Sequence, residues 1–187
     1  MTFFTERPVS APAVILIGPP GSGKSTVGPL LAALLGVDFA DTDGLIAEAA
    51  GKPVGDIFIE DGEDAFRALE RSAVPEAVAA HGGVLALGSG SVLSEDIRKL
   101  LAGRPVVYLE TGFPAVARRS GLEGPRPPLP GNPRGRLRQM LEERRGLYEE
   151  VAWLTVPTDD LEPQQIAEQI APAIAGGQAE PGSQARP

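Results

Sequence analysis

The stretch from Ala13 to Thr26, with the sequence AVILIGPPGSGKST, constrains the fold of this chain more than any other. Its first part, residues 13–17, is apolar and largely β-branched, which predicts a strand buried on both faces of a parallel sheet. The turn that follows has the spacing G-x-x-x-x-G-K-[ST], formed by Gly18, Gly23, Lys24 and Ser25. A strand leading into such a loop predicts binding of a nucleoside triphosphate, whereas the alternative is a surface turn with a solvated lysine.

The residues after this loop predict how phosphates are held. Residues 26–35 are typical of a helix, whose positive N-terminal end would point at the same anion. We expect Lys24 to reach the β- and γ-phosphates and the Ser25 hydroxyl to bind Mg²⁺. The ATP-binding residues predicted in this loop are Gly21, Ser22, Gly23, Lys24, Ser25 and Thr26.

Composition and charge argue against several classes of protein and of binding site. The chain has 187 residues, an ordinary size for one domain, and no cysteine, which excludes disulfides and cysteine metal sites. A formal net charge of −8 argues against a nucleic-acid partner. No apolar run approaches the ~20 residues of a membrane helix, and the N-terminus lacks a basic region followed by an apolar core. We therefore expect a cytoplasmic monomer with no membrane partner.

Strands and helices alternate along the rest of the chain. Buried strands are predicted at 37–40, 84–87, 105–110 and within 151–156, and helices at 94–102, 136–152 and 163–175. Five strands that alternate with helices predict a doubly wound α/β domain with a parallel sheet. We assign residues 13–175 to this single domain, 1–12 to a loose lead-in and 176–187 to a disordered tail.

Two segments depart from simple alternation. Residues 44–80 have a helical pattern with breaks at 51–53 and 61–62, which predicts an inserted helical subdomain that binds substrate. In it, Phe66, Leu69 and Ala73 would share an apolar face, with Arg67 and Glu70 to one side. Residues 120–135 are rich in proline and glycine with almost no apolar anchor, a composition typical of a mobile lid.

Two carboxylates, Asp41 and Asp43, follow the second predicted strand, at the edge where open α/β sheets bind ligands. Transfer of a phosphoryl group needs a metal, an oriented acceptor and cations near the transferring group. We expect Asp41 to serve the metal with Ser25, and Asp43 to orient or deprotonate the acceptor hydroxyl. Arg126, in the lid, would reach the transferring group, so that the catalytic set is Lys24, Asp43 and Arg126. Alternatively, both aspartates only cap a strand end.

Six motifs, in their order and spacing, resemble those of the shikimate kinases: GPPGSGKST, FADTD, DIFIEDGEDAFRALE, VLALGSGSV, PRPPL and RRGLY. The likeness runs from about Ala13 to Ile170. It implies a P-loop kinase fold that transfers the γ-phosphoryl group of ATP to the 3-hydroxyl of shikimate, with Mg²⁺. The pathway implied is the chorismate route to aromatic amino acids.

The same resemblance implies roles for particular residues. Asp43 would hold the acceptor hydroxyls, Arg67 and Arg144 the shikimate carboxylate, and the loop around Ser89 a further hydroxyl. The substrate-binding set is then Asp43, Arg67, Gly88, Ser89, Gly90 and Arg144. The lid residue Arg126 would touch the phosphates and Arg119 would lie near the adenine. Planar guanidinium groups suit a small carboxylate, which supports this assignment.

Other interpretations remain open at this stage. Arg67 and Arg144 could be surface arginines paired with Glu63, Glu70, Glu142 or Glu143. The family usually has glycine where this chain has Ser89, which would be strained by about 1 kcal/mol if its φ were positive. A gluconate-type kinase would share Lys24, Ser25 and Asp43 without needing paired arginines, and a nucleotide-dependent switch module would need no small acceptor.

Overall fold

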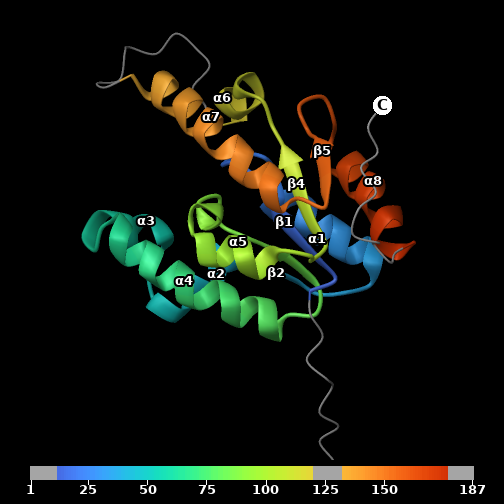
Figure 1. The fold of residues 1–187 in the computed structure, drawn as a ribbon, viewed down its shortest axis with the longest axis horizontal. Helices are drawn as coiled ribbons and strands as arrows, with labels where there is room; N and C mark the ends of the chain where they lie inside the picture. Colours follow the sequence, from blue (N-terminus) through green and yellow to red (C-terminus); the bar gives the residue numbers. More distant parts are fainter. Residues whose placement is uncertain (1–11, 120–131, 177–187) are drawn as a thin grey trace, which may run out of the picture.

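A parallel sheet lies at the centre of the computed structural model, which describes residues 12–119 and 132–176 (Figure 1). Its five strands are β1 (Val14–Ile17), β2 (Phe39–Asp41), β3 (Val84–Ala86), β4 (Val106–Glu110) and β5 (Leu154–Pro157). They lie in the order β2-β3-β1-β4-β5, and each adjacent pair is parallel. The central strand β1 therefore delivers the glycine-rich loop to the carboxyl edge of the sheet, where such folds bind ligands.

Helices cover both faces of this sheet, as a doubly wound fold requires. Val14 and Leu16 of β1 pack in one core with α1 (Lys24–Leu35) and α8 (Pro163–Ala175). Ile15 and Ile17 face the opposite core, formed with α4 (Glu63–Ala80), α5 (Glu95–Leu101) and α7 (Pro133–Val151). Because alternate residues of a strand point to opposite faces, burial on both sides explains the unbroken apolar run. The predicted α/β fold is confirmed.

Helix α1 begins at Lys24, two residues earlier than predicted, directly after Gly23 in the left-handed region with φ 98°. The helix runs on through Pro29 to Leu35. Gly28 allows a close approach of β2, since a Cβ there would overlap the ring of Phe39. Gly28 therefore lets α1 pack directly against β2, the strand that ends at Asp41.

The predicted inserted subdomain consists of α2 (Thr42–Ala50), α3 (Val54–Glu60) and α4, separated at the predicted breaks and forming a lobe to one side of the sheet (Figure 1). Ile46, Ile57 and Phe66 form a small core of its own. The predicted apolar face of α4 is wrong in one position, because Leu69 is 40% exposed. The buried face instead follows Phe66, Glu70 and Val74 at four-residue spacing, and Glu70 is only 2% exposed. A carboxylate therefore lies inside the lobe where the sequence predicted a lateral position.

The remaining described elements are η1 (Ser91–Leu93) and α6 (Phe113–Arg119). Arg126 and most of the predicted lid, residues 120–131, lie outside the described residues, as do residues 1–11 and 177–187. Helix α7 begins at Pro133, capped by the Asn132 side chain, so the last three residues assigned to the lid belong to a helix. Within the described ranges, no helix has the length and apolarity needed to cross a membrane.

Candidate active site

The glycine-rich loop folds around the side chain of its own lysine. The Lys24 ammonium donates hydrogen bonds to the carbonyl oxygens of Gly18 at 2.7 Å and Pro19 at 3.1 Å. Gly21 and Gly23 have φ of 74° and 98°, a region that other residues rarely enter. Burial lowers the pKa of Lys24 to about 8, although the charges of Asp41 and Asp43 oppose this shift. The loop thus holds the lysine at the carboxyl end of β1, and its contact with phosphates stays a prediction.

Asp41 connects this loop to the inserted lobe. The Ser25 hydroxyl donates a hydrogen bond to Asp41 Oδ2 at 2.6 Å, and Asp41 Oδ1 accepts one from the Asp43 backbone N–H at 3.0 Å. The second bond caps α2, so Asp43 lies in the first turn of that helix rather than at a strand end. A serine hydroxyl beside a carboxylate offers the hard oxygen ligands that Mg²⁺ prefers. These two residues therefore fit the predicted metal site.

Asp43 has an unusual carboxylate. Its Oδ1 is the one buried side-chain nitrogen or oxygen atom of the described residues that has no hydrogen-bond partner. Burial raises the pKa of Asp43, with further contributions from the negative charges of Asp41 and Glu70, while Lys24 and Arg67 oppose the shift. Gly88 lies against this group, since a Cβ there would stand 2.5 Å from Asp43 Oδ1. A buried acceptor with a raised pKa can take a hydrogen bond or a proton from a hydroxyl.

Arg67 is held by an acidic residue that the sequence analysis did not assign to the site. Its Nη1 donates to Glu70 Oε2 at 2.6 Å, and the Ser91 hydroxyl donates to the other Glu70 oxygen at 2.7 Å. The Arg67 guanidinium lies so close to Gly90 that a Cβ there would overlap it. The pairing with Glu63 and Glu70 considered above is thus present, and it holds Arg67 against the loop at 88–90. The three-residue spacing of Arg67 and Glu70 on a helix is the local signal for this pair.

Arg144 reaches the same loop from α7. Its Nη1 donates to the Ser89 carbonyl at 3.4 Å, and no carboxylate of the described residues lies within salt-bridge distance of it. Tyr148, one turn further along α7, donates its hydroxyl to the same carbonyl at 2.7 Å. Ser89 does not have a positive φ, since Asn132 is the one non-glycine residue of the described ranges that does. The strain considered for Ser89 is therefore absent.

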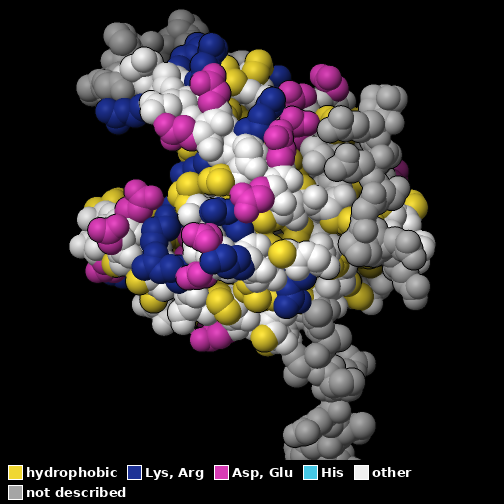
Figure 2. Space-filling view, in the orientation of Figure 1, with side chains coloured by type: hydrophobic (Ala, Val, Ile, Leu, Met, Phe, Trp, Pro, Cys, Tyr) yellow, Lys and Arg dark blue, Asp and Glu magenta, His cyan; other side chains and the backbone are white. Residues whose placement is uncertain are grey.

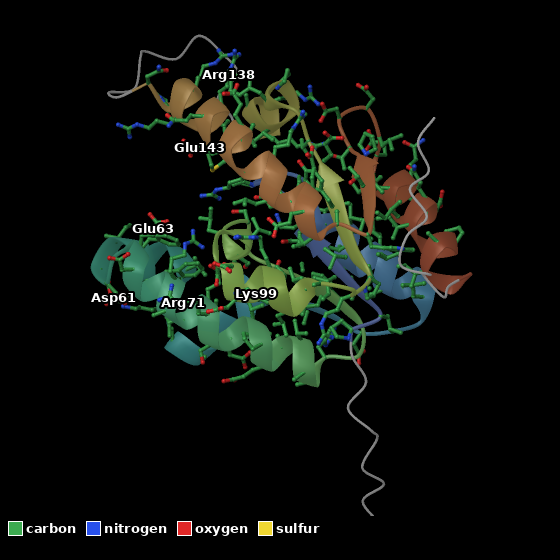
Figure 3. All side chains as sticks on the ribbon, viewed as in Figure 1. Asp61, Glu63, Arg71, Lys99, Arg138 and Glu143 are labelled. Carbon is green, nitrogen blue, oxygen red and sulfur yellow. The ribbon has the colours of Figure 1, made fainter. Side chains whose placement is uncertain are left out.

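A small pocket of about 240 Å³ lies between α4 and the segment at residues 90–94, which contains η1. Its lining includes Arg67, Glu70, Arg71 and Gly90. Figure 2 shows the surface hollowed between the lobe and α7, with Lys and Arg side chains gathered on the lobe beside the hollow. In Figure 3, Glu63 on the lobe and Glu143 on α7 lie on opposite sides of this opening. The acceptor end of the candidate site thus lies between two separate parts of the chain.

Arg119 of α6 connects two segments of the chain at the expected nucleotide end of the site. Its guanidinium donates to the carbonyl oxygens of Gly21 at 3.0 Å and Thr158 at 2.9 Å, which ties the glycine-rich loop to the segment after β5. A cavity of about 530 Å³ lies there, lined by both segments and by Arg118. Asp159 accepts hydrogen bonds from the Gly112 N–H, so its carboxylate supports the neighbouring loop. Arg119 thus lines the cavity beside the glycine-rich loop, and its contact with adenine stays a prediction.

A profile of the shikimate kinase family matches residues 20–175. This chain belongs to the shikimate kinase family. A shikimate kinase of Thermobifida fusca is 56% identical over 87% of this chain and 94% of its own length. One of Salinispora arenicola is 52% identical over 88% of this chain and 99% of its own length. The family and the function as an ATP-dependent shikimate kinase, both predicted from the motifs, are confirmed.

Solved structures give the same family likeness. A shikimate kinase from Acinetobacter baumannii, described as a complex with shikimate, has a TM-score of 0.81 and 34% identity. The alignment covers 92% of this chain and 97% of that one. A gluconokinase from Sinorhizobium meliloti has a TM-score of 0.55 at 21% identity, a likeness that concerns the fold alone. The rival gluconate-type kinase thus shares the architecture, and side chains must distinguish the two acceptors.

Proposed function

We propose that this shikimate kinase transfers the γ-phosphoryl group of ATP to the 3-hydroxyl of shikimate through the residues that surround Asp43. The observation that carries this assignment is the buried, unpartnered Asp43 Oδ1 beside Gly88. Arg67 and Arg144 contact the loop that continues from Gly88. The Asp43 oxygen can accept a hydrogen bond from a hydroxyl, and two guanidinium groups can bind a carboxylate. Together they suit a substrate that has both hydroxyls and a carboxylate.

At the nucleotide end, the backbone N–H groups of Gly21, Ser22 and Gly23 and the start of α1 would bind the phosphates. Lys24 would exchange its bonds to Gly18 and Pro19 for the β- and γ-phosphates. Ser25 and Asp41 would hold Mg²⁺, which neutralises phosphate charge when bound. Arg119 would lie by the adenine, while Arg126, outside the described residues, would reach the transferring group.

At the acceptor end, Asp43 Oδ1 would accept the proton of the 3-hydroxyl as that oxygen forms its bond to the γ-phosphorus. The bond between this phosphorus and the oxygen bridging to ADP breaks, and its electron pair leaves with ADP. The raised pKa of Asp43 suits it to hold this proton. Arg67 and Arg144 would bind the carboxylate, with a further hydroxyl at Gly88, Ser89 and Gly90, so that the reacting hydroxyl is the one at Asp43.

An assay of ADP release with a panel of acceptors tests this proposal. ATP and Mg²⁺ are supplied with shikimate, gluconate, AMP or no acceptor. We expect rapid release with shikimate alone, because the chain belongs to the shikimate kinase family. Faster turnover with gluconate would assign a different acceptor to the same fold. Equal release without any acceptor would favour a nucleotide-dependent switch module.

A further inference from the structure

The loop at residues 88–90 is held from α7 through a single backbone carbonyl. The Ser89 oxygen accepts a hydrogen bond from the Tyr148 hydroxyl at 2.7 Å, and Arg144 Nη1 lies 3.4 Å from the same oxygen. Tyr148 is 59 residues away in sequence, so this contact joins two distant elements. The carbonyl is the atom through which α7 sets the position of the loop.

Tyr148 is itself held firmly. Its side chain is 1% exposed and stacks on Tyr108 of β4, with ring centroids 5.1 Å apart and planes inclined by 19°. Burial raises the pKa of Tyr148 to about 12, although Arg144 opposes the shift. The hydroxyl therefore remains protonated at neutral pH and can donate to a carbonyl, which only accepts. Stacking by itself would need the ring alone, so the hydroxyl has a separate role.

Because a peptide bond is planar, holding the Ser89 carbonyl in place also fixes the direction of the Gly90 N–H. The bond between Ser89 and Gly90 is trans and planar, so its N–H points away from its C=O. With the carbonyl held toward Tyr148, the Gly90 N–H points away from α7. Among the residues that the structure describes, no oxygen accepts a hydrogen bond from this N–H. The Gly90 α-carbon also lies against the Arg67 guanidinium, so the donor belongs to the acceptor end of the site.

We propose that Tyr148 is a positioning residue for the acceptor, acting through the Ser89 carbonyl to aim the Gly90 N–H. This inference rests on the proposed function, since it concerns the same acceptor end. Tyr148 and Arg144 lie one turn apart on α7 and both contact the Ser89 carbonyl. The position of the loop relative to Arg144 is therefore set by one helix. The tyrosine hydroxyl itself does not contact the acceptor.

The test compares Tyr148→Phe with Tyr108→Phe. Each substitution removes one hydroxyl from the same stacked pair, but the Tyr108 hydroxyl makes no hydrogen bond within the described ranges. We expect Tyr148→Phe to raise the KM for shikimate about three- to tenfold, with the KM for ATP and kcat within about twofold of wild type. Tyr108→Phe should leave all three constants near wild type. An unchanged shikimate KM in Tyr148→Phe, or equal increases in both variants, would overturn the proposal.

Amide hydrogen exchange in the peptide spanning residues 87–92 provides a readout that does not depend on the acceptor. Exchange there should be faster in Tyr148→Phe than in Tyr108→Phe, with no added ligand. Equal exchange in the two variants would show that the hydroxyl does not hold the loop. If exchange responds but the wild type phosphorylates another acceptor, the positioning role stands and the proposed function fails.

Discussion

The two ends of the proposed active site are built in different ways. The phosphate end comes from one continuous stretch, in which β1, the loop at residues 18–23 and α1 follow one another. The acceptor end combines four separate pieces, namely Asp43 on α2, Arg67 on α4, the loop at residues 88–90 and Arg144 on α7. Backbone groups and one lysine define the first end, and side chains from distant elements define the second.

The phosphate end depends less on tertiary packing than the acceptor end does. The phosphate end needs only glycines that reach positive φ and a helix start, both of which are local properties. The acceptor end needs a buried ion pair, a tyrosine stack and a capped helix to bring its groups together. Substitutions at the acceptor end should therefore separate effects on chemistry, acceptor binding and stability, and the following predictions test this in order of decreasing effect.

The largest effect is expected for Asp43→Asn. An amide cannot accept the hydroxyl proton, so kcat should fall by about 10²-fold or more, with a smaller change in the KM for shikimate. The measurement is steady-state kinetics with shikimate varied at saturating ATP. Asp56→Asn, an identical change at an exposed position on α3, is the matched control and should have near-normal kcat. A kcat close to wild type in Asp43→Asn would remove Asp43 from the chemical step.

Arg67→Ala and Arg144→Ala should each raise the KM for shikimate at least about tenfold, because each loses a charge-assisted hydrogen bond to the carboxylate. Thermal unfolding should distinguish them. Arg67→Ala leaves the buried Glu70 without its cation and should lower the free energy of unfolding by about 1–3 kcal/mol. Arg144 has no carboxylate partner among the described residues, so its loss should cost little stability. Identical melting curves for the two variants would contradict this distinction.

The affinity for ATP should fall about tenfold between about pH 7 and about pH 9. The lowered pKa of Lys24, about 8, means that the free enzyme loses this ammonium charge in that range. Bound phosphates favour the charged form, so ATP binding takes up a proton there.

The effect of Lys24 on stability has the opposite sign. Between pH 8 and 10.5 the unfolded chain binds more protons than the folded chain, so this group raises the free energy of unfolding as pH increases.

Titration calorimetry with an ATP analogue at several pH values measures this effect. Lys24→Arg is the control, because a guanidinium stays charged throughout the range. Its affinity is expected to be independent of pH over the same interval, whatever its absolute value. A wild-type affinity that is also independent of pH would show that the pKa of Lys24 is not lowered.

The smallest effect is expected for Ser89→Gly. Ser89 has no positive φ, so the change relieves no strain and instead adds backbone freedom to the unfolded chain. Stability should fall by about 0.5–1 kcal/mol, and the preference for shikimate over gluconate should stay within about twofold of wild type. A rise in stability would mean that Ser89 is strained after all. A changed preference would show that its side chain helps to select the acceptor.

Local patterns of residues were enough to predict the fold and the phosphate end. An apolar run followed by G-x-x-x-x-G-K-[ST] has few other structural solutions, because it combines a buried strand, positive-φ turns and a helix start within a short span. The helix breaks at Gly51 and at Gly62 were equally local, since both glycines have a positive φ, a conformation that other residues rarely adopt. The motifs also identified the family, because their order and spacing reflect the whole domain.

The way the acceptor end is held depends on packing between distant elements. Helical periodicity on α4 could not show that Glu70 is buried and Leu69 exposed, because a favourable partner on another element outweighs hydrophobicity. The same holds for Tyr148, whose hydroxyl meets the Ser89 carbonyl only after α7 packs beside η1. This contact joins residues 59 positions apart, so it depends on where α7 packs and not on the residues next to either partner in the chain.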